Sequence, residues 1–221
     1  MQFNFEYMLN LFPILLKYLG TTMQMALIGV VFALILAIGL AVVRTFKVPV
    51  LNQLAMLFIS FFRGTPLLVQ LFLLYYGLPR LFPILINMDA FTASVIGLTL
   101  HFAAYKAESI RAAIMAVDKS QMEASLSIGM TTSQAMRRIV LPQAARIATP
   151  SLMNYFIDMI KSTSLAFTLG VTEIMAKTQM EASSSFYFFE SYLTVALIYW
   201  AVVLAFTQIQ VHLERYLNKA Y

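Results

Sequence analysis

Long apolar runs separated by short polar segments extend through the whole chain. A helix of about 20 apolar residues crosses the hydrocarbon core of a bilayer, and a charge at its centre is energetically costly. The pattern therefore predicts an all-α, polytopic membrane protein with five transmembrane helices. The predicted spans are residues 18–43, 52–78, 90–115, 147–170 and 191–211.

The composition supports a membrane protein. Hydrophobic residues make up 61% of the chain and charged residues 11%, whereas soluble domains carry about 25% charged residues. The absence of cysteine excludes disulfides, thiolate metal sites and cysteine catalysis. We expect a single transmembrane domain over residues 1–221, with its first span retained because no basic start and small-residue cleavage site precede it.

The basic residues predict the orientation. Nine of them flank one set of connections between spans, and three lie in the opposite set. The positive-inside rule then places the N-terminus outside and the C-terminus in the cytoplasm. The nine are Arg44, Lys47, Arg111, Lys119, Arg137, Arg138, Arg146, Arg215 and Lys219, and the three are Lys17, Arg80 and Lys177. Most of the net charge of +5 comes from the basic residues that set this orientation.

The longest segment of soluble character lies between the third and fourth predicted spans, on the cytoplasmic side. Ser120 with Glu123, and Thr131 with Gln134, have the spacing of helix-capping boxes, and Gly129 lies between them. Glycine ends helices because it adopts positive φ without steric cost. We predict a helix, a sharp turn and a second helix.

This two-helix unit is too short to bury a core of its own, and we expect its second helix to end near Pro142. Its apolar residues should therefore pack against another surface, which we expect to be a partner protein. They are Ala124, Ile128, Met130, Ile139 and Leu141.

The same segment resembles the "EAA" loop of permease subunits of ABC importers, with Ser125 in place of the second alanine. In that family the loop docks into a cleft on a cytoplasmic ATPase. Two amphipathic helices on the membrane surface would be the alternative, but would not require the spaced glycine and the Ile-x-Leu-Pro sequence. The resemblance implies coupling roles for Glu123, Ala124, Gly129, Ile139, Leu141 and Pro142.

Glycine and proline interrupt the second predicted span at Arg63-Gly64-Thr65-Pro66. Proline lacks an amide hydrogen, so we expect a break or kink whose freed carbonyls need protein or water. Arg63 then lies near a polar cavity, or else snorkels to the cytoplasmic face. The stretch to Gln70 resembles the Arg-Gly-Thr-Pro-Leu-Leu-Val-Gln signature of the polar amino acid branch.

In the first span, Gly29 and Gly39 predict close helix packing.

The third span places His101, Tyr105 and Glu108 on one helical face. Glu108 can pair with Arg111 three residues on, or with Lys106 elsewhere in the bundle. A structural pairing and a cavity-lining role for Glu108 both remain open. We expect His101 to be a packed or interfacial residue rather than a ligand. The stretch around Tyr105 resembles the Ala-Ala-Tyr-x-x-Glu pattern of the same branch.

The fourth span holds the densest polar cluster. Asp158 and Lys161 lie three residues apart, so they can pair on one face of the helix. Each is the partner that most readily lowers the energetic cost of the other's charge in an apolar interior. The pair either belongs to a pathway or only fixes the helix register. We expect both groups to be buried, so removing one alone leaves an unpaired buried charge at a cost of about 3 to 5 kcal/mol. The hydroxyl side chains that follow Lys161 either line a hydrated surface or form hydrogen bonds with the backbone at a helix break. This stretch also resembles the Lys-x-Thr-Ser-Leu sequence of the polar amino acid branch. The predicted substrate pathway comprises Arg63, Gln70, Tyr105, Glu108, Asn154, Asp158, Lys161, Ser162, Thr163 and Ser164.

Catalytic and nucleotide-binding patterns are missing. The sequence has no phosphate-binding loop, no Ser-His-Asp set, no histidine-rich metal cluster and no basic run typical of nucleic-acid binding. An intramembrane enzyme would depend on Asp158 and Glu108 alone. An ion channel would need a ring of like charges or a carbonyl filter. We therefore expect a transport subunit without catalytic, metal or cofactor sites, with ATP and magnesium held by a partner.

The three resembling stretches together imply the permease subunit of an ABC importer in a bacterial cell membrane. Embedded cations are Arg63, Lys106 and Lys161, against the anions Glu108 and Asp158, so no acidic excess favours a basic substrate. We expect a polar, net-neutral amino acid, with a basic amino acid as the alternative. The resemblance of residues 161–189 to cystine-type permeases favours cystine, with glutamine next. The expected partners are an ATPase dimer, a second or homologous permease copy, and an extracytoplasmic binding protein. A short amphipathic helix within residues 172–190 offers the binding protein a docking surface.

Overall fold

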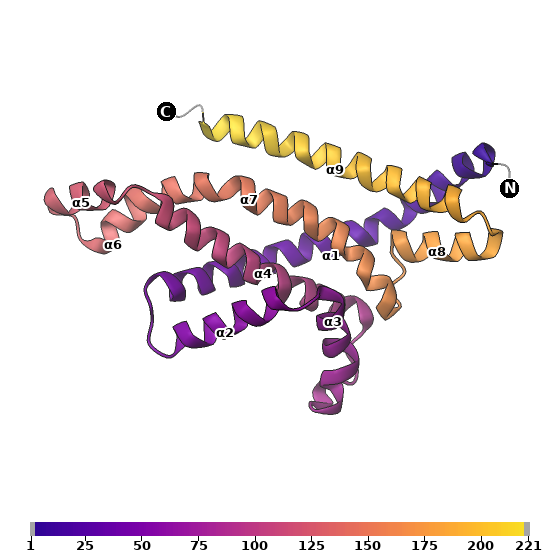
Figure 1. Ribbon diagram of the computed structural model, residues 1–221, viewed down its shortest axis with the longest axis horizontal. Helices are drawn as coiled ribbons and strands as arrows, with labels where there is room; N and C mark the ends of the chain where they lie inside the picture. The colour runs from indigo at the N-terminus through magenta and orange to yellow at the C-terminus, as the bar shows by residue number, and fades with distance from the viewer. Residues whose placement is uncertain (1–2, 219–221) are drawn as a thin grey trace. The chain divides into compact units, whose positions relative to one another are not determined.

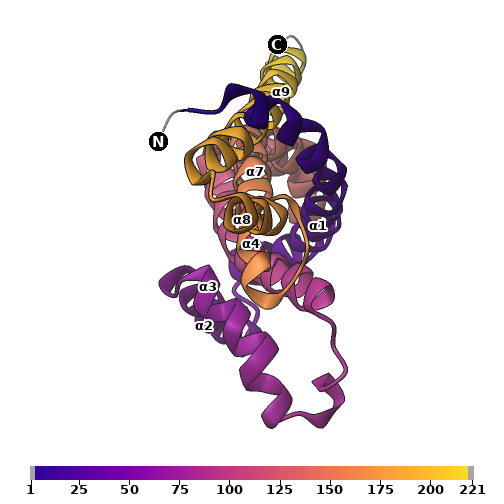
Figure 2. The ribbon, with the colours of Figure 1, turned by 90° about the vertical axis from the view of Figure 1, so that its right-hand side faces the viewer.

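Helices with short connections make up the chain (Figures 1 and 2). The structure, a computed structural model, describes residues 3–218. Because these residues contain no strand, the predicted all-α class is confirmed. The α-helices are α1 Phe5–Thr45, α2 Leu51–Gly64, α3 Leu67–Phe72, α4 Ala90–Ala116, α5 Lys119–Ser127, α6 Thr132–Ala135, α7 Leu141–Ser162, α8 Ile174–Ser185 and α9 Phe188–Asn218. Two π-helices, Leu73–Gly77 and Met136–Val140, and three 3₁₀ segments, Leu78–Arg80, Pro83–Leu85 and Thr163–Leu169, complete the path.

Two helices of the described part are long and apolar enough to cross a membrane, Phe5–Thr45 and Phe188–Leu217. A third qualifies if Leu51–Gly64 and Leu67–Arg80 count as one broken span. The five spans and their orientation stay predictions. Helix α1 begins earlier than the predicted first span because a helix can continue beyond the hydrocarbon, where a charge does not interrupt it.

The predicted break in the second span is present. Helix α2 ends at Gly64, and Pro66 has φ −65° and ψ 139° before α3 begins. Proline cannot supply the amide that a continuous helix would need. The Gln70 side-chain amide donates to the Thr65 carbonyl at 3.0 Å and to its hydroxyl at 2.8 Å. The buried Gln70 thus satisfies polar groups that the break would leave open.

The chain divides into two compact units. Unit 1 comprises the chain up to Val31, Thr65–Thr99 and Phe156–Gln208. Unit 2 comprises Phe32–Gly64, Leu100–Tyr155 and the chain from Ile209. Helices α1, α4, α7 and α9 each contribute to both units, so neither unit is a continuous piece of sequence.

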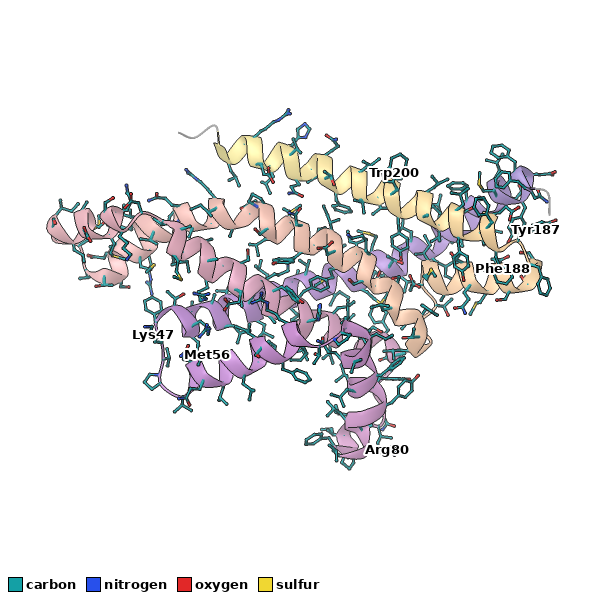
Figure 3. The ribbon with its side chains drawn as sticks, viewed as in Figure 1. Lys47, Met56, Arg80, Tyr187, Phe188 and Trp200 are labelled. Atoms are coloured by element: carbon teal, nitrogen blue, oxygen red, sulfur yellow. The ribbon has the colours of Figure 1, made fainter. Side chains whose placement is uncertain are left out.

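Unit 2 is packed through small residues. Ala37 of α1, Ala104 and Ala107 of α4, and Ile59 of α2 form one buried cluster, because small side chains let helix backbones approach closely. The turn between α1 and α2 carries Lys47 (Figure 3). A second cluster joins the end of α4 to the following π-helix and α7 through Ala113, Val117, Val140, Ala144 and Ala148.

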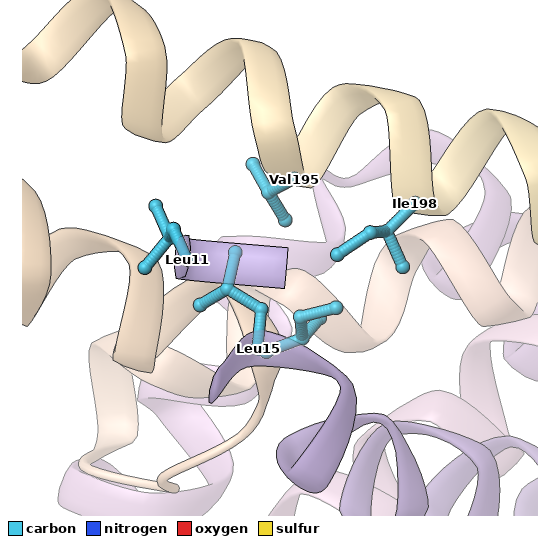
Figure 4. Packing of buried hydrophobic residues seen from close by; sticks show 5 residues of the cluster. Leu11, Leu15, Val195 and Ile198 are labelled. Carbon is cyan, nitrogen blue, oxygen red and sulfur yellow. The ribbon is translucent and has the colours of Figure 1, made fainter. Parts of the chain in front are cut away.

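Unit 1 has its core where α1, α8 and α9 meet (Figure 4). Leu11 and Leu15 of α1 face Val195 and Ile198 of α9, and Ile174 from the start of α8 completes the cluster. The spacings of four and three residues put each pair on one helical face. The short helix predicted within residues 172–190 is therefore confirmed as α8, held by this core.

The glycine prediction for the first span is half right. A Cβ placed at Gly29 would lie 3.0 Å from the sulfur of Met159, so Gly29 does permit close packing in unit 1. A Cβ at Gly39 would meet no atom within 4 Å. The expectation of close packing at Gly39 is wrong within this chain, because α1 faces open space there.

Candidate functional site

The helix–turn–helix predicted between the third and fourth spans is formed by α5 and α6, but its first cap differs from the prediction. Asp118 is the N-cap of α5, and its carboxylate accepts a hydrogen bond from the Ser120 amide at 2.9 Å. The predicted box of Ser120 with Glu123 is wrong, since both lie inside the helix. Asp118 precedes them and is an equally good capping residue.

The turn itself has the predicted geometry. Gly129 has φ +86°, a conformation that residues with a Cβ rarely adopt. Its amide donates to the Leu126 carbonyl at 3.0 Å, and the Met130 amide reaches the Ser125 carbonyl at 3.1 Å. These bonds close the end of α5. The sharp stop at Gly129 is confirmed.

The second capping box is also confirmed. The Thr131 amide donates to the Gln134 side-chain oxygen at 2.9 Å, and the Gln134 amide donates to the Thr131 hydroxyl at 3.3 Å. Helix α6 therefore begins at a defined point directly after the turn.

The second helix does not end near Pro142, which corrects the prediction. Helix α6 passes through the π-helix Met136–Val140 directly into α7, which begins at Leu141. Pro142 has no amide hydrogen, so the carbonyl of Arg138 cannot receive the usual bond from four residues on. A shift to π spacing accommodates this loss without ending the helix. Pro142 therefore lies within a continuous helical path.

The helix–turn–helix has two distinct faces. Its inner face packs on the unit 2 core through Met122, Met136 and Val140, so part of its apolar surface is covered within the chain. A partner surface for the exposed remainder stays a prediction. Its outer face exposes Glu123, Ala124 and Leu141, and Ile128 is 76% exposed. Met130 and Ile139 are partly buried. Several exposed large apolar residues in this segment, Leu126, Ile128 and Leu141, are suited to contact with another protein.

A cation–aromatic cluster forms in unit 2. The Arg63 guanidinium carbon lies 5.5 Å from the centroid of the Tyr105 ring, whose hydroxyl donates to the Arg63 carbonyl at 3.5 Å. The Tyr105 ring also lies 5.0 Å from His101 and 5.8 Å from Tyr155. The predicted packing of His101 is confirmed. Arg63 is exposed and can present its charge over an aromatic face.

The three charged side chains of α4, Lys106, Glu108 and Arg111, are engaged within unit 2. Glu108 pairs with Arg111 at 2.7 Å, as predicted, and with Arg44 at 3.7 Å. Lys106 is 1% exposed and donates to the carbonyl of Leu152 at 3.1 Å. The alternative pairing of Lys106 with Glu108 is not formed. Each charge therefore already has a partner inside the chain.

In unit 1, the Lys161 ammonium lies 2.7 Å from an Asp158 carboxylate oxygen, as predicted. The side chains are 53% and 50% exposed, so the pair is not buried within the chain. Burial of both groups cannot be read from helical spacing alone. The exposed Asn154 lies four residues earlier on α7, in unit 2.

Three hydroxyl residues after Lys161 satisfy backbone carbonyls where α7 passes into 3₁₀ geometry. Ser162 donates to Asp158, Thr163 to Ile160 and Ser164 to Lys161, at 2.7 to 2.8 Å. This is one of the two roles predicted for these residues. Thr163 is fully buried. Helix α3, which carries Gln70, contacts this 3₁₀ segment.

Sequence reasoning missed the buried carboxylate of Glu173. It is the N-cap of α8, accepting from the Ala176 amide at 2.8 Å, and it also lies 3.3 Å from the Thr22 hydroxyl and 3.4 Å from the Tyr199 hydroxyl. Burial raises the pKa of Glu173, and hydrogen bonds to the carboxylate partly oppose this. An acidic residue directly before a predicted helix could have identified Glu173 as an N-cap. Its burial could not be predicted in this way, because it depends on contacts with α1 and α9.

No group of three or more histidine, cysteine or acidic residues that could hold a metal ion occurs within residues 3–218.

Comparisons with known proteins give one family. Residues 29–219 match the binding-protein-dependent transport system inner membrane component. The chain is 73% identical over 221 residues to the probable amino-acid ABC transporter permease protein PatM of Vibrio harveyi, covering 100% of this chain and 99% of PatM. It is 43% identical over 198 residues to the L-cystine transport system permease protein TcyL of Bacillus subtilis (strain 168), covering 88% and 83%.

A solved chain from the crystal structure of an amino acid ABC transporter with histidines superposes with a TM-score of 0.90 and 34% identity, covering 97% of this chain and 99% of that one. The resemblance drawn from the sequence is confirmed. The named relatives are permease proteins, so the prediction of a transport subunit rather than an enzyme is confirmed as well.

Proposed function

Since this chain belongs to the family of binding-protein-dependent transport system inner membrane components, we propose that it is the permease subunit of an ATP-driven importer for a polar, net-neutral amino acid. Cystine is the favoured substrate and glutamine the next. The proposed location is a bacterial inner membrane. Two copies, or this chain with a homologous one, form the pathway.

The observation that carries the proposal is the outer face of α5 and α6, where Ile128 is exposed beside the left-handed Gly129. This face docks on a cytoplasmic ATPase dimer, which binds ATP and magnesium. Glu123 and Ala124 on α5, with Leu141 at the start of α7, complete the contact. Nucleotide-driven movement of the ATPases displaces the loop, and the helices convert this displacement into alternating access.

The exposed polar groups supply the candidate pathway residues. Arg63 and Asn154 in unit 2, and Asp158 and Lys161 in unit 1, are exposed or half-exposed. An amino acid presents a carboxylate and an ammonium, so a cation and an anion are both needed. Tyr105 contacts Arg63 within unit 2, and Ser162 and Ser164 follow Lys161 closely along the chain. Gln70 and Thr163 are buried and support the backbone instead.

The charge balance favours a net-neutral substrate over a basic one. Lys106 is held by a backbone carbonyl, so it does not count among pathway charges. Glu108 is paired with two arginines, and Asp158 is paired with Lys161. No acidic excess remains to attract a second positive charge. The identity with a permease named for L-cystine supports cystine.

The test is transport by the reconstituted complex of permease, ATPase and binding protein in proteoliposomes. Labelled cystine, glutamine and arginine are supplied outside, with ATP in the compartment of the ATPase. We expect ATP-dependent accumulation of cystine or glutamine. Uptake confined to arginine or lysine would overturn the substrate assignment, and uptake without the ATPase subunit would overturn the importer assignment.

A further inference from the structure

An apolar groove runs along unit 2 between the second half of α1 and the first half of α2. Its volume is about 510 Å³. Every lining residue is apolar. The lining consists of Ile35, Leu36, Gly39, Leu40 and Val43 from α1, and Leu51, Leu54, Ala55 and Phe58 from α2.

Gly39 keeps the groove open. Because a Cβ there would meet no atom within 4 Å, its missing side chain leaves space at the floor. On the rims, Ile35 is 63% exposed and Leu54 57% exposed. Unfilled apolar space forfeits dispersion contacts. A flexible chain that follows the groove would restore them.

One end of the groove carries a positive charge. The lining ends at Val43 and Leu51, on either side of the turn that holds Lys47 (Figure 3). Lys47 is exposed, with φ +50°. The neighbouring Arg44 is already engaged by Asn52 and Glu108. Lys47 is therefore the cation that this end of the groove presents.

We propose that this groove binds one acyl chain of an anionic phospholipid of the cytoplasmic leaflet, with Lys47 paired to the headgroup phosphate. The inference goes beyond the proposed function and shares with it only the orientation, which places Lys47 at the cytoplasmic surface. Basic sites on that side of membrane proteins select anionic headgroups. One lysine near the surface corresponds to a preference of about fivefold.

A helix from a second copy of the chain fits the groove less well. An apolar transmembrane helix could cover the lining, but it brings no anion to pair with Lys47. An acyl chain is thin enough to enter, and a phosphate complements the charge at the groove's end.

The experiment is native mass spectrometry of the purified transporter complex, titrated with phosphatidylglycerol or with phosphatidylcholine of the same acyl chains. We expect the first bound phosphatidylglycerol to be retained about fivefold more tightly than phosphatidylcholine. Lys47→Gln should abolish this preference while keeping binding at the level of phosphatidylcholine.

Gly39→Leu should fill the groove and remove the first bound lipid of either kind. The matched control is Gly20→Leu, because Gly20 is also in α1 and also faces open space. It should bind as wild type does. Thermal unfolding of each variant checks folding, and Lys47→Gln tests the headgroup contact even if Gly39→Leu is unstable.

Unchanged lipid binding in a folded Gly39→Leu variant would overturn the proposal, as would an unchanged headgroup preference in Lys47→Gln. If Gly39→Leu instead dissociates the two permease copies, the groove is an interface between them and the lipid assignment is wrong. These readouts do not involve transport, so they stand or fall separately from the proposed substrate.

Discussion

Lys106 donates a hydrogen bond from its ammonium to the backbone carbonyl of Leu152, 3.1 Å away, and thereby joins α4 to α7 within unit 2. The same ammonium lies 5.8 Å from the centroid of the Tyr155 ring. A lysine that is 1% exposed and satisfied in this way is a structural tether. It is not available to a substrate carboxylate.

The first prediction contrasts this tether with Arg63. Lys106→Met keeps the length of the side chain but removes its hydrogen bond to the Leu152 carbonyl, so we expect the free energy of unfolding to fall by about 1 to 3 kcal/mol. The amino acids transported should stay the same. Arg63→Met should raise KM without lowering stability, because Arg63 is exposed. Thermal unfolding and uptake kinetics check both, and a selective KM change in Lys106→Met would contradict the assignment.

The second prediction concerns coupling through Gly129. A β-branched residue at φ +86° costs about 1 to 2 kcal/mol locally, so Gly129→Val should insert and fold but shift the turn between α5 and α6. We expect loss of substrate-stimulated ATPase activity and of uptake. Gly129→Asn should restore much of both, since asparagine tolerates the left-handed conformation. Wild-type coupling in Gly129→Val would show that the turn geometry is not required.

A third prediction revises the strength of the Asp158–Lys161 pair. Full burial would imply about 3 to 5 kcal/mol for removing one partner, but both side chains are about half exposed. Exposed pairs contribute about 0.2 to 1 kcal/mol. A double-mutant cycle with Asp158→Asn and Lys161→Met should therefore give a stability coupling below about 1 kcal/mol, while each single substitution impairs uptake. A coupling above about 3 kcal/mol would show that assembly buries the pair.

The fourth prediction concerns pH and Glu173. Its folded-state pKa is raised by burial above the ordinary value of 4.5, so the folded chain holds the proton more tightly than the unfolded chain. Its contribution to stability is complete below the unfolded pKa and is lost as pH rises through the raised folded pKa. Glu173→Gln should remove this part of the pH dependence.

The measurement for Glu173 is the unfolding temperature of wild type and variant between about pH 4 and about pH 8. Glu181→Gln is the control, because Glu181 also lies in α8 but is paired with Lys177 at 2.7 Å and is partly exposed. We expect the control to follow the wild-type slope. Equal slopes for wild type and Glu173→Gln would mean that burial does not control this carboxyl.

Local features of the sequence were sufficient for much of the fold. The bounds of α4 follow from the length of a mainly apolar run, the break at Pro66 from a missing amide, and the turn at Gly129 from its positive φ. The first cap was misassigned because Asp118 competes with Ser120 for the same role. Helix bounds, breaks, turns and caps depend mainly on residues that are neighbours along the chain, and these are the relationships that a sequence shows most directly.

Burial was the part that the sequence could not supply. Helical spacing paired Asp158 with Lys161 and Glu108 with Arg111 correctly, but it gave no measure of their exposure. Lys106 and Glu173 are buried because residues from distant segments cover them and supply their hydrogen-bond partners. Those contacts arise from tertiary packing, and no motif around either residue encodes them.

The uninterrupted helical path from Thr132 through the π-helix into α7 has a mechanical consequence. Within unit 2 it runs to Tyr155, about 36 Å at 1.5 Å per residue. A helix of this length is a stiff strut, so force applied beside Thr131 is delivered along its axis instead of being absorbed by a hinge. The strut is most easily deformed at two places, the π turn at Met136–Val140, whose hydrogen bonds are less regular, and Pro150, which lies inside α7 and has no amide hydrogen to donate. Twisting strain should therefore concentrate at these two places, of which the first carries the basic pair Arg137 and Arg138.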